Sequence, residues 1–141
     1  MPLHGTPIGL RLALTSKAVS RAFNDALAEA GGSLPMWLVL TSLRDGDPRT
    51  QLDLARAVGV EGPTLTRHLD TFEQAGLVGR HRDTGDRRAV RVELTEAGVK
   101  RHGELLKAAI AFNERLTAGL GEAELKQLAD GLARLEQNVR D

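Results

Sequence analysis

Residues 77–98 decide the fold, and they read LVGRHRDTGDRRAVRVELTEAG. Apolar side chains alternate with charged ones over residues 90–94, which is typical of a β-strand with one buried face. Residues 77–82 form a candidate partner strand, and the residues from Asp83 to Asp86 form a glycine-containing hairpin tip. The stretch therefore predicts a β-hairpin, and no other segment of the sequence has clear strand character.

A helix-turn-helix pattern lies immediately before the hairpin. The sequence predicts a short helix over residues 50–57 and a second helix from about residue 62 to 75. Gly59 stands at the turn, where the chain must adopt a left-handed backbone conformation, and Ala55 is small where the two helices would cross. Apolar residues that would fix the crossing angle are Leu54, Val58, Val60 and Leu65. A hairpin directly after such a pair of helices is a wing, so the pattern predicts a winged helix-turn-helix.

Longer helical patterns flank this lobe. Residues 8–30, 95 to about 120 and 122–139 have the spacing of helices, and a further helix begins at Ser33 and contains Trp37. In the last helix, apolar residues three and four positions apart form a seam that packs against another helix. The seam consists of Leu125, Leu128, Leu132, Leu135 and Val139. We expect it to pack against a second copy of the chain; packing within the chain is the alternative.

The predicted fold class is mainly α with a small β-hairpin wing: a winged helix-turn-helix with N- and C-terminal dimerisation helices. We expect a single domain over residues 1–141, because a chain of this length allows one core. Within it, residues 33–94 form the winged lobe, and residues 1–32 and 95–141 form the helical dimerisation region.

The charge of the chain is balanced as a whole but uneven locally. Nineteen basic residues face nineteen acidic ones, so the formal net charge is zero. Residues 80–91 nevertheless hold five arginines against two aspartates. These arginines are Arg80, Arg82, Arg87, Arg88 and Arg91. Because a polyanion responds to the local field, this patch favours a nucleic acid as the partner.

The second helix of the pair and the wing supply the candidate DNA contacts. A recognition helix reads base edges from its N-terminal turns, and an arginine there can grip a guanine edge. The candidates on this helix are Gly62, Pro63, Thr64, Arg67 and His68. An arginine at a hairpin tip can enter the minor groove beside a supporting carboxylate. The wing candidates are Arg82, Asp86, Arg87 and Arg88. The alternatives are a solvated helix face and a tip charged for solubility.

The composition argues against other functional classes. The chain has no cysteine, which excludes a thiol nucleophile, a disulfide and a thiolate metal site. Its four histidines lack the spacing of metal ligands, and no phosphate-binding glycine loop or nucleophile motif is present. We expect no enzyme activity, no metal and no cofactor.

No apolar run approaches the roughly 20 residues of a membrane span, and the N-terminus lacks a signal-peptide pattern. We therefore expect a cytoplasmic protein with no membrane partner.

The same residues resemble a known family. The stretch from Leu77 to Arg88 resembles the wing signature of the MarR family of winged-helix regulators, and Leu94 to Gly98 resembles its entry into the next helix. Residues 59–70 are similar to the recognition helix of the SlyA-like branch. Gly62 departs from this pattern, because a bulkier polar residue is common there.

The resemblance implies a mode of action. Members of the family are homodimers formed by the first, fifth and sixth helices, which adds Leu12 to the expected interface. They bind pseudo-palindromic duplex DNA, with Arg87 as the implied minor-groove residue and Asp86 and Arg88 supporting it. Many are released by small, often phenolic, anionic effectors. The implied effector pocket would contain Arg11, Leu14, Met36, Trp37 and Leu40. The alternative is that Trp37 is simply a core residue.

These expectations combine into one hypothesis and one rival. The hypothesis is a dimeric, sequence-specific transcriptional regulator that places its recognition helix in the major groove and its wing in the minor groove. The rival is a winged-helix protein-interaction module that binds no DNA, since a fold alone does not define a function. The basic wing favours the first.

Overall fold

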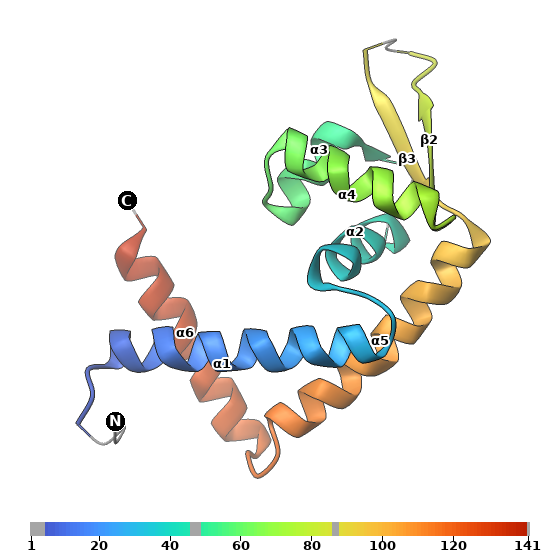
Figure 1. The fold of residues 1–141 in the computed structure, drawn as a ribbon. Helices are drawn as coiled ribbons and strands as arrows, with labels where there is room; N and C mark the ends of the chain where they lie inside the picture. The colour runs from blue at the N-terminus through green and yellow to red at the C-terminus, as the bar shows by residue number, and fades with distance from the viewer. Residues whose placement is uncertain (1–4, 46–48, 86–87, 141) are drawn as a thin grey trace. The chain divides into compact units, whose positions relative to one another are not determined.

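The computed structural model describes residues 5–45, 49–85 and 88–140 (Figure 1). The chain divides into two compact units, residues 1–109 and 110–141. In chain order the elements are α1 (Ile8–Glu29), α2 (Leu34–Arg44), β1 (Arg49–Thr50), α3 (Gln51–Val58), α4 (Gly62–Gln74), β2 (Val78–Arg82), β3 (Val90–Leu94), α5 (Glu96–Leu116) and α6 (Glu122–Val139). The predicted fold class is confirmed: helices dominate, and one small sheet forms the wing.

Local side-chain chemistry sets the ends of the helices around the predicted lobe. The Thr50 hydroxyl accepts a hydrogen bond of 3.1 Å from the amide of Asp53 and so caps α3. Ser33 caps α2 in the same way through the amide of Met36. Gly59 has a φ of 72°, the left-handed conformation that reverses the chain between α3 and α4. The predicted helix-turn-helix is therefore confirmed.

The sheet has three antiparallel strands in the order β1-β3-β2. In the predicted hairpin, Arg80 lies opposite Val92 and Arg82 lies opposite Val90. Figure 1 shows β2 and β3 extending away from the helices of the lobe. The third strand, β1, was not predicted. It has two residues, which pair with Val92 and Arg91, and such a short strand shows no alternation in the sequence.

The core of the first unit lies where α2, α3 and α4 meet the sheet. Leu40, Leu54, Leu65 and Leu69 are fully buried there, and Val92 of β3 covers them from the sheet. The end of α1 and the middle of α5 also contribute one buried leucine each, Leu27 and Leu105. Burial of these side chains supplies the main favourable term for folding of the lobe.

The fifth helix ends earlier than its sequence pattern predicts. We expected it to continue to about Leu120, but α5 stops at Leu116. The hydroxyl of Thr117 donates to the carbonyl of Asn113, and Gly119 adopts a φ of 85°. A left-handed residue cannot continue a right-handed helix, so the chain turns before α6 begins.

Gly98 in the first turn of α5 provides a test of this packing. A Cβ at Gly98 would lie 2.0 Å from the carbonyl oxygen of Leu77, and backbone cannot move aside as a side chain can. Gly98→Ala should lower the free energy of unfolding by about 1–3 kcal/mol, as overpacking does. Urea denaturation followed by circular dichroism measures this loss.

Gly103→Ala is the matched control on the same helix. Among the described residues, no heavy atom outside the neighbouring backbone of α5 lies within 4 Å of a Cβ at Gly103, so alanine should raise stability by about 0.5–1 kcal/mol through helix propensity. A Gly98→Ala variant as stable as the native chain would contradict the packing of α5 against Leu77.

Candidate nucleic-acid interface

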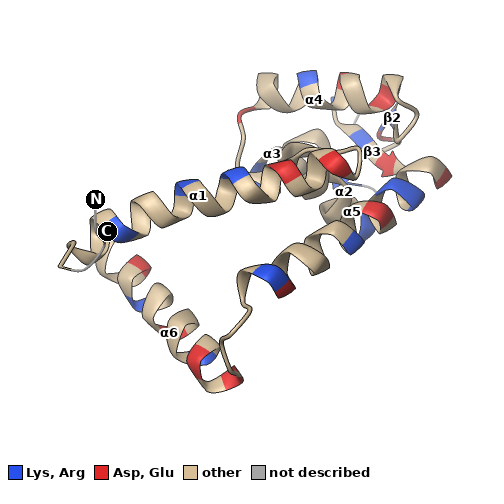
Figure 2. Cartoon of the chain, turned by 60° about the horizontal axis from the view of Figure 1, so that its bottom comes forward, with Lys and Arg blue, Asp and Glu red and all other residues tan. Residues whose placement is uncertain are grey.

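The recognition helix of the predicted motif, α4, has one buried and one exposed face. Leu65, Leu69 and Phe72 are 0–3% exposed and hold the helix against the core. The opposite face presents Pro63 and Arg67, and both side chains are exposed. Arg67 is the only lysine or arginine in the sequence of α4, and Figure 2 colours these residue types blue. Core packing therefore dictates which side of α4 a ligand can reach.

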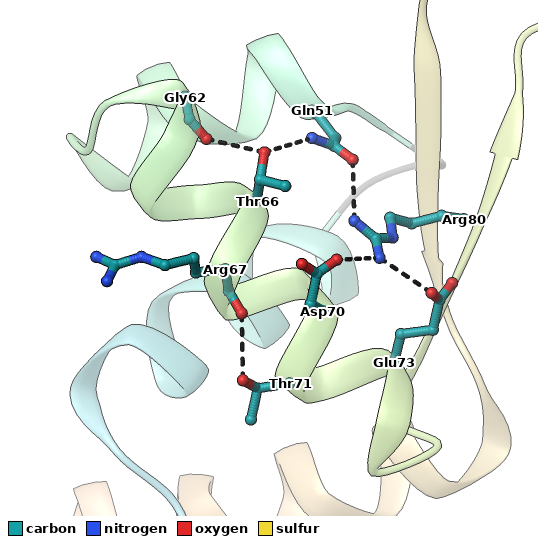
Figure 3. Close-up of polar contacts among 8 residues, drawn as sticks. All are labelled: Gln51, Gly62, Thr66, Arg67, Asp70, Thr71, Glu73 and Arg80. Carbon is teal, nitrogen blue, oxygen red and sulfur yellow. Dashed lines mark hydrogen bonds and ion pairs between the residues drawn. The ribbon is translucent and has the colours of Figure 1, made fainter.

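Arg67 occupies the middle of this exposed face. Its carbonyl accepts a 3.2 Å hydrogen bond from the Thr71 hydroxyl, while its side chain extends away from the lobe (Figure 3). Within the part of the chain that the structure describes, its guanidinium has no hydrogen-bond or ion-pair partner. All five of its N–H donors are thus available to an external acceptor.

The other predicted contacts on α4 differ in accessibility. Gly62 and Pro63 are exposed in the first turn, and Thr64 is half-buried. His68 lies at the edge of the face, because one residue further along a helix turns the side chain by about 100°. Its half-buried ring stacks on Phe72 with the ring centroids 6.0 Å apart. His68 also borders an apolar cavity of about 160 Å³ between α2 and α4. Its role as a base contact stays a prediction.

One guanidinium joins three elements beside this face (Figure 3). Arg80 Nη2 lies 2.5 Å from Asp70 Oδ1 and 3.0 Å from Glu73 Oε1, both on α4. Arg80 Nη1 donates to Gln51 Oε1 of α3 at 3.4 Å. The hydrogen bond from Arg80 is the main cause that holds the pKa of Glu73 below its usual value. This arrangement was missed at the sequence level, where Arg80 counted only as part of the basic patch.

The wing carries the remaining predicted contacts. Arg82 and Arg88 are exposed, whereas Asp86 and Arg87 lie outside the described residues. Arg91 Nε lies 3.5 Å from Asp83 Oδ2. The pKa of Asp83 is lowered, chiefly by the hydrogen bond from the Gly85 amide and also by Arg91. Arg80 and Arg91 of the patch therefore face carboxylates of the protein itself.

Comparison with known proteins agrees with this geometry. A family model described as MarR family matches residues 33–90. The solved transcriptional regulator PA3341 is 36% identical, with 94% of this chain and 98% of that chain covered and a TM-score of 0.77. The transcriptional repressor CouR, solved with a 23-mer DNA duplex, is 27% identical, with 96% of each chain covered and a TM-score of 0.85. A MarR variant from E. coli, complexed with operator DNA, is 25% identical, with 94% and 96% covered and a TM-score of 0.82.

The chain belongs to the MarR family. This confirms the resemblance inferred from the wing and the recognition helix. The SlyA-like branch within the family stays a prediction. In this MarR-family chain, the described residues contain no group of three or more side chains that could hold a metal ion, and none of the described helices is long and apolar enough to cross a membrane.

The five residues of the implied effector pocket lie in different surroundings. Leu40 is fully buried, and Met36 and Trp37 pack against the core of the first unit. Trp37 also stacks on the buried His102 of α5, with ring centroids 5.4 Å apart and planes 6° apart. On α1, Leu14 is 41% exposed and Arg11 is half-buried. The apolar cavity beside His68 contains none of these five residues, and an effector pocket stays a prediction.

The stack of Trp37 on His102 allows a direct titration. Burial, followed by the charge of Arg44, lowers the pKa of His102 from its ordinary value of 6.5, although Asp45 opposes this. Trp37 is the only tryptophan of the chain, and a protonated imidazole in contact quenches indole emission. The fluorescence of Trp37 should therefore fall with a midpoint below pH 6.5.

The same group makes the fold sensitive to pH. A lowered pKa means that the unfolded chain takes up the proton first, so the stability from His102 is present above pH 6.5 and is lost as the pH falls through the folded-state pKa. The His102→Phe variant should lose the fluorescence transition and should lose less stability between about pH 7 and 5. An unchanged fluorescence titration in that variant would contradict this assignment.

Proposed function

We propose that this protein is a dimeric, sequence-specific DNA-binding regulator that docks α4 in the major groove and its wing in the minor groove. One observation carries the proposal. The guanidinium of Arg67 is exposed at the centre of the α4 face that points away from the core, and it has no partner among the described residues. CouR and the E. coli MarR variant, which are similar over at least 94% of this chain, were solved with DNA.

The size and chemistry of α4 suit this role. The major groove of B-DNA admits one α-helix, and an arginine can hydrogen-bond both acceptors on the guanine edge. In our proposal Arg67 reads such an edge, while Gly62, Pro63 and Thr64 approach neighbouring base pairs from the first turn. A protein-binding winged helix would gain little from an exposed arginine on this helix together with Arg82 and Arg88 on the wing.

The wing completes the contact with DNA in this proposal. Arg82 and Arg88 are exposed on either side of the hairpin tip, and Arg87 lies between them in the sequence. A narrow minor groove has a strongly negative potential that attracts arginine side chains. We propose that these arginines supply affinity, whereas Arg67 supplies discrimination between sequences.

Exposed apolar residues on α6 and α1 offer a surface for a second copy of the chain. On α6, Leu128, Leu132 and Val139 of the predicted seam are 41–80% exposed, and Leu12 on α1 is 40% exposed. A row of exposed apolar side chains on one side of a helix is stabilised when another helix covers it. We propose that a partner subunit covers these residues, so that two recognition helices meet two half-sites of a pseudo-palindromic operator.

The role of Arg67 can be tested by fluorescence anisotropy with the duplex upstream of the protein's own gene and a scrambled duplex. Arg67→Ala should reduce the preference for the operator by about 1–3 kcal/mol, because a bidentate base contact is lost. Gln74→Ala, at the other end of the same helix, is the control and should leave the preference nearly unchanged. Binding by the native protein should weaken steeply with salt.

Equal preference in the native protein and in Arg67→Ala would rule out the proposed base contact. No preference of the native protein for any duplex in a random-sequence selection would instead favour the protein-interaction module.

The dimer can be tested at Leu132. A charge in the middle of an apolar seam must lose its hydration on association, so Leu132→Asp should shift the equilibrium toward monomer. Sedimentation equilibrium measures the shift. Gln127→Asp places the same charge on the exposed surface of α6 away from the seam and should leave the dimer intact. A native protein that sediments as a monomer would end this part of the proposal.

A further inference from the structure

The two parts of the proposed interface meet at Arg80. Successive side chains of a strand point to opposite faces, so Arg80 lies on the same face of β2 as Val78, which is 2% exposed. That face packs toward α4, and it carries the Arg80 side chain to Asp70 and Glu73 (Figure 3). One guanidinium thus connects the wing directly with the second half of the recognition helix.

A chain of hydrogen bonds extends this connection to the first turn of α4. Arg80 Nη1 donates to Gln51 Oε1, and Gln51 Nε2 donates to the hydroxyl oxygen of Thr66 at 3.3 Å. The same hydroxyl donates to the carbonyl of Gly62 at 3.0 Å. Arg80 therefore fixes the wing relative to both ends of the helix, directly at one end and through α3 at the other (Figure 3).

The charge around Arg80 is unsuited to a phosphate contact. Two carboxylates share its single positive charge, so the three side chains together carry a formal charge of −1. The Arg80 side chain is 18% exposed, whereas Asp70 and Glu73 are 54% and 42% exposed. A phosphate that approached this group would meet the carboxylates first. Arg67 on the same helix has the opposite environment, exposed and without a carboxylate partner among the described residues.

The geometry points to Arg80 as a positioning residue: it sets the distance and angle between α4 and the wing, so that one subunit can engage the major and the minor groove together, and it does not itself bind DNA. This inference rests on the proposed function. Base readout requires α4 and the wing to be in register with the duplex at the same time. Non-specific binding depends mainly on the number of phosphates that the protein contacts. Loss of Arg80 should therefore reduce binding to the operator much more than binding to other DNA.

Replacement of Arg80 by lysine distinguishes a positioning role from a direct contact with phosphate. A lysine retains the positive charge and serves well as a point charge for phosphate, but it lacks the planar fork that bridges two carboxylates and an amide. If Arg80 positions α4 and the wing, Arg80→Lys and Arg80→Gln should both weaken operator binding by about tenfold, the size of one charge-assisted hydrogen bond. Both variants should bind scrambled duplex as the native protein does.

The matched control is Arg82, on the same face of the same strand but further toward the tip. Arg82→Gln should weaken binding to operator and scrambled duplex alike and lower the slope of log affinity against log salt by about one, because a phosphate contact is lost. Arg82→Lys should retain most of the native affinity for both duplexes and most of the native salt slope, because lysine keeps the positive charge. Arg80→Gln should keep the native slope.

A double-mutant cycle in the absence of DNA tests the contact itself. Arg80→Gln, Asp70→Asn and the double variant are compared by urea unfolding, which also shows that each variant folds. The two changes should be non-additive, because each removes one charge of the same ion pair. Additive changes would overturn the inference, since Arg80 would then not hold Asp70 in solution.

The DNA measurements distinguish this inference from the function on which it rests. If the native protein prefers its operator and Arg80→Lys binds as the native protein does, the positioning role is wrong and the proposed function stands. The same holds if Arg80→Gln lowers the salt slope by about one, which would make Arg80 a phosphate contact. If the native protein prefers no duplex, the proposed function fails, and the positioning role fails with it.

Discussion

The close crossing of α3 and α4 is the constraint on which the rest of the structure depends. Ala55 is small and 7% exposed at this crossing, and its carbonyl accepts hydrogen bonds from the amides of Gly59 and Val60 in the turn. Once the turn is made, Leu65 and Leu69 must enter the core, since burial of such side chains drives folding. The remaining side of α4 is then exposed by geometry alone, and this places Arg67 outward. The exposure of this side of α4 is thus a consequence of how the lobe packs.

The arginines near this face differ in their exposure and in the contacts that the structure shows for them. Arg80 and Arg91 face carboxylates of the protein, and these contacts stiffen the lobe and the hairpin. Arg67, Arg82 and Arg88 are exposed. A protein with zero net charge can present positive charge locally where arginines outnumber carboxylates along the chain, as they do over residues 80–91. The hydroxyls of Thr66 and Thr71 are also engaged by backbone carbonyls, which narrows the set of α4 side chains available to a base.

Much of the fold was predictable because its signals are local. The caps at Ser33 and Thr50, the left-handed Gly59 and the alternation over residues 90–94 each act within a few residues of sequence. Where a signal was weak or absent, prediction failed. A strand as short as β1 has no periodicity, and the end of α5 depends on Gly119, which lies inside a helical pattern that continues to about residue 120.

The sequence by itself determined the winged helix-turn-helix, the exposed position of Arg67 and the basic character of the wing, since these follow from side-chain period, turn chemistry and composition. Only the tertiary structure decided which side chains Arg80 contacts. Arg80 and Asp70 are ten residues apart, and Arg80 and Gln51 are 29 apart. The contacts of Arg80 with Asp70 and Gln51 depend on the register of β2 with β3 and on the packing of β2 beside α4. A count of charges along the chain treats every arginine of the patch alike, whereas the fold places the Arg80 side chain, which is 18% exposed, beside two carboxylates of α4.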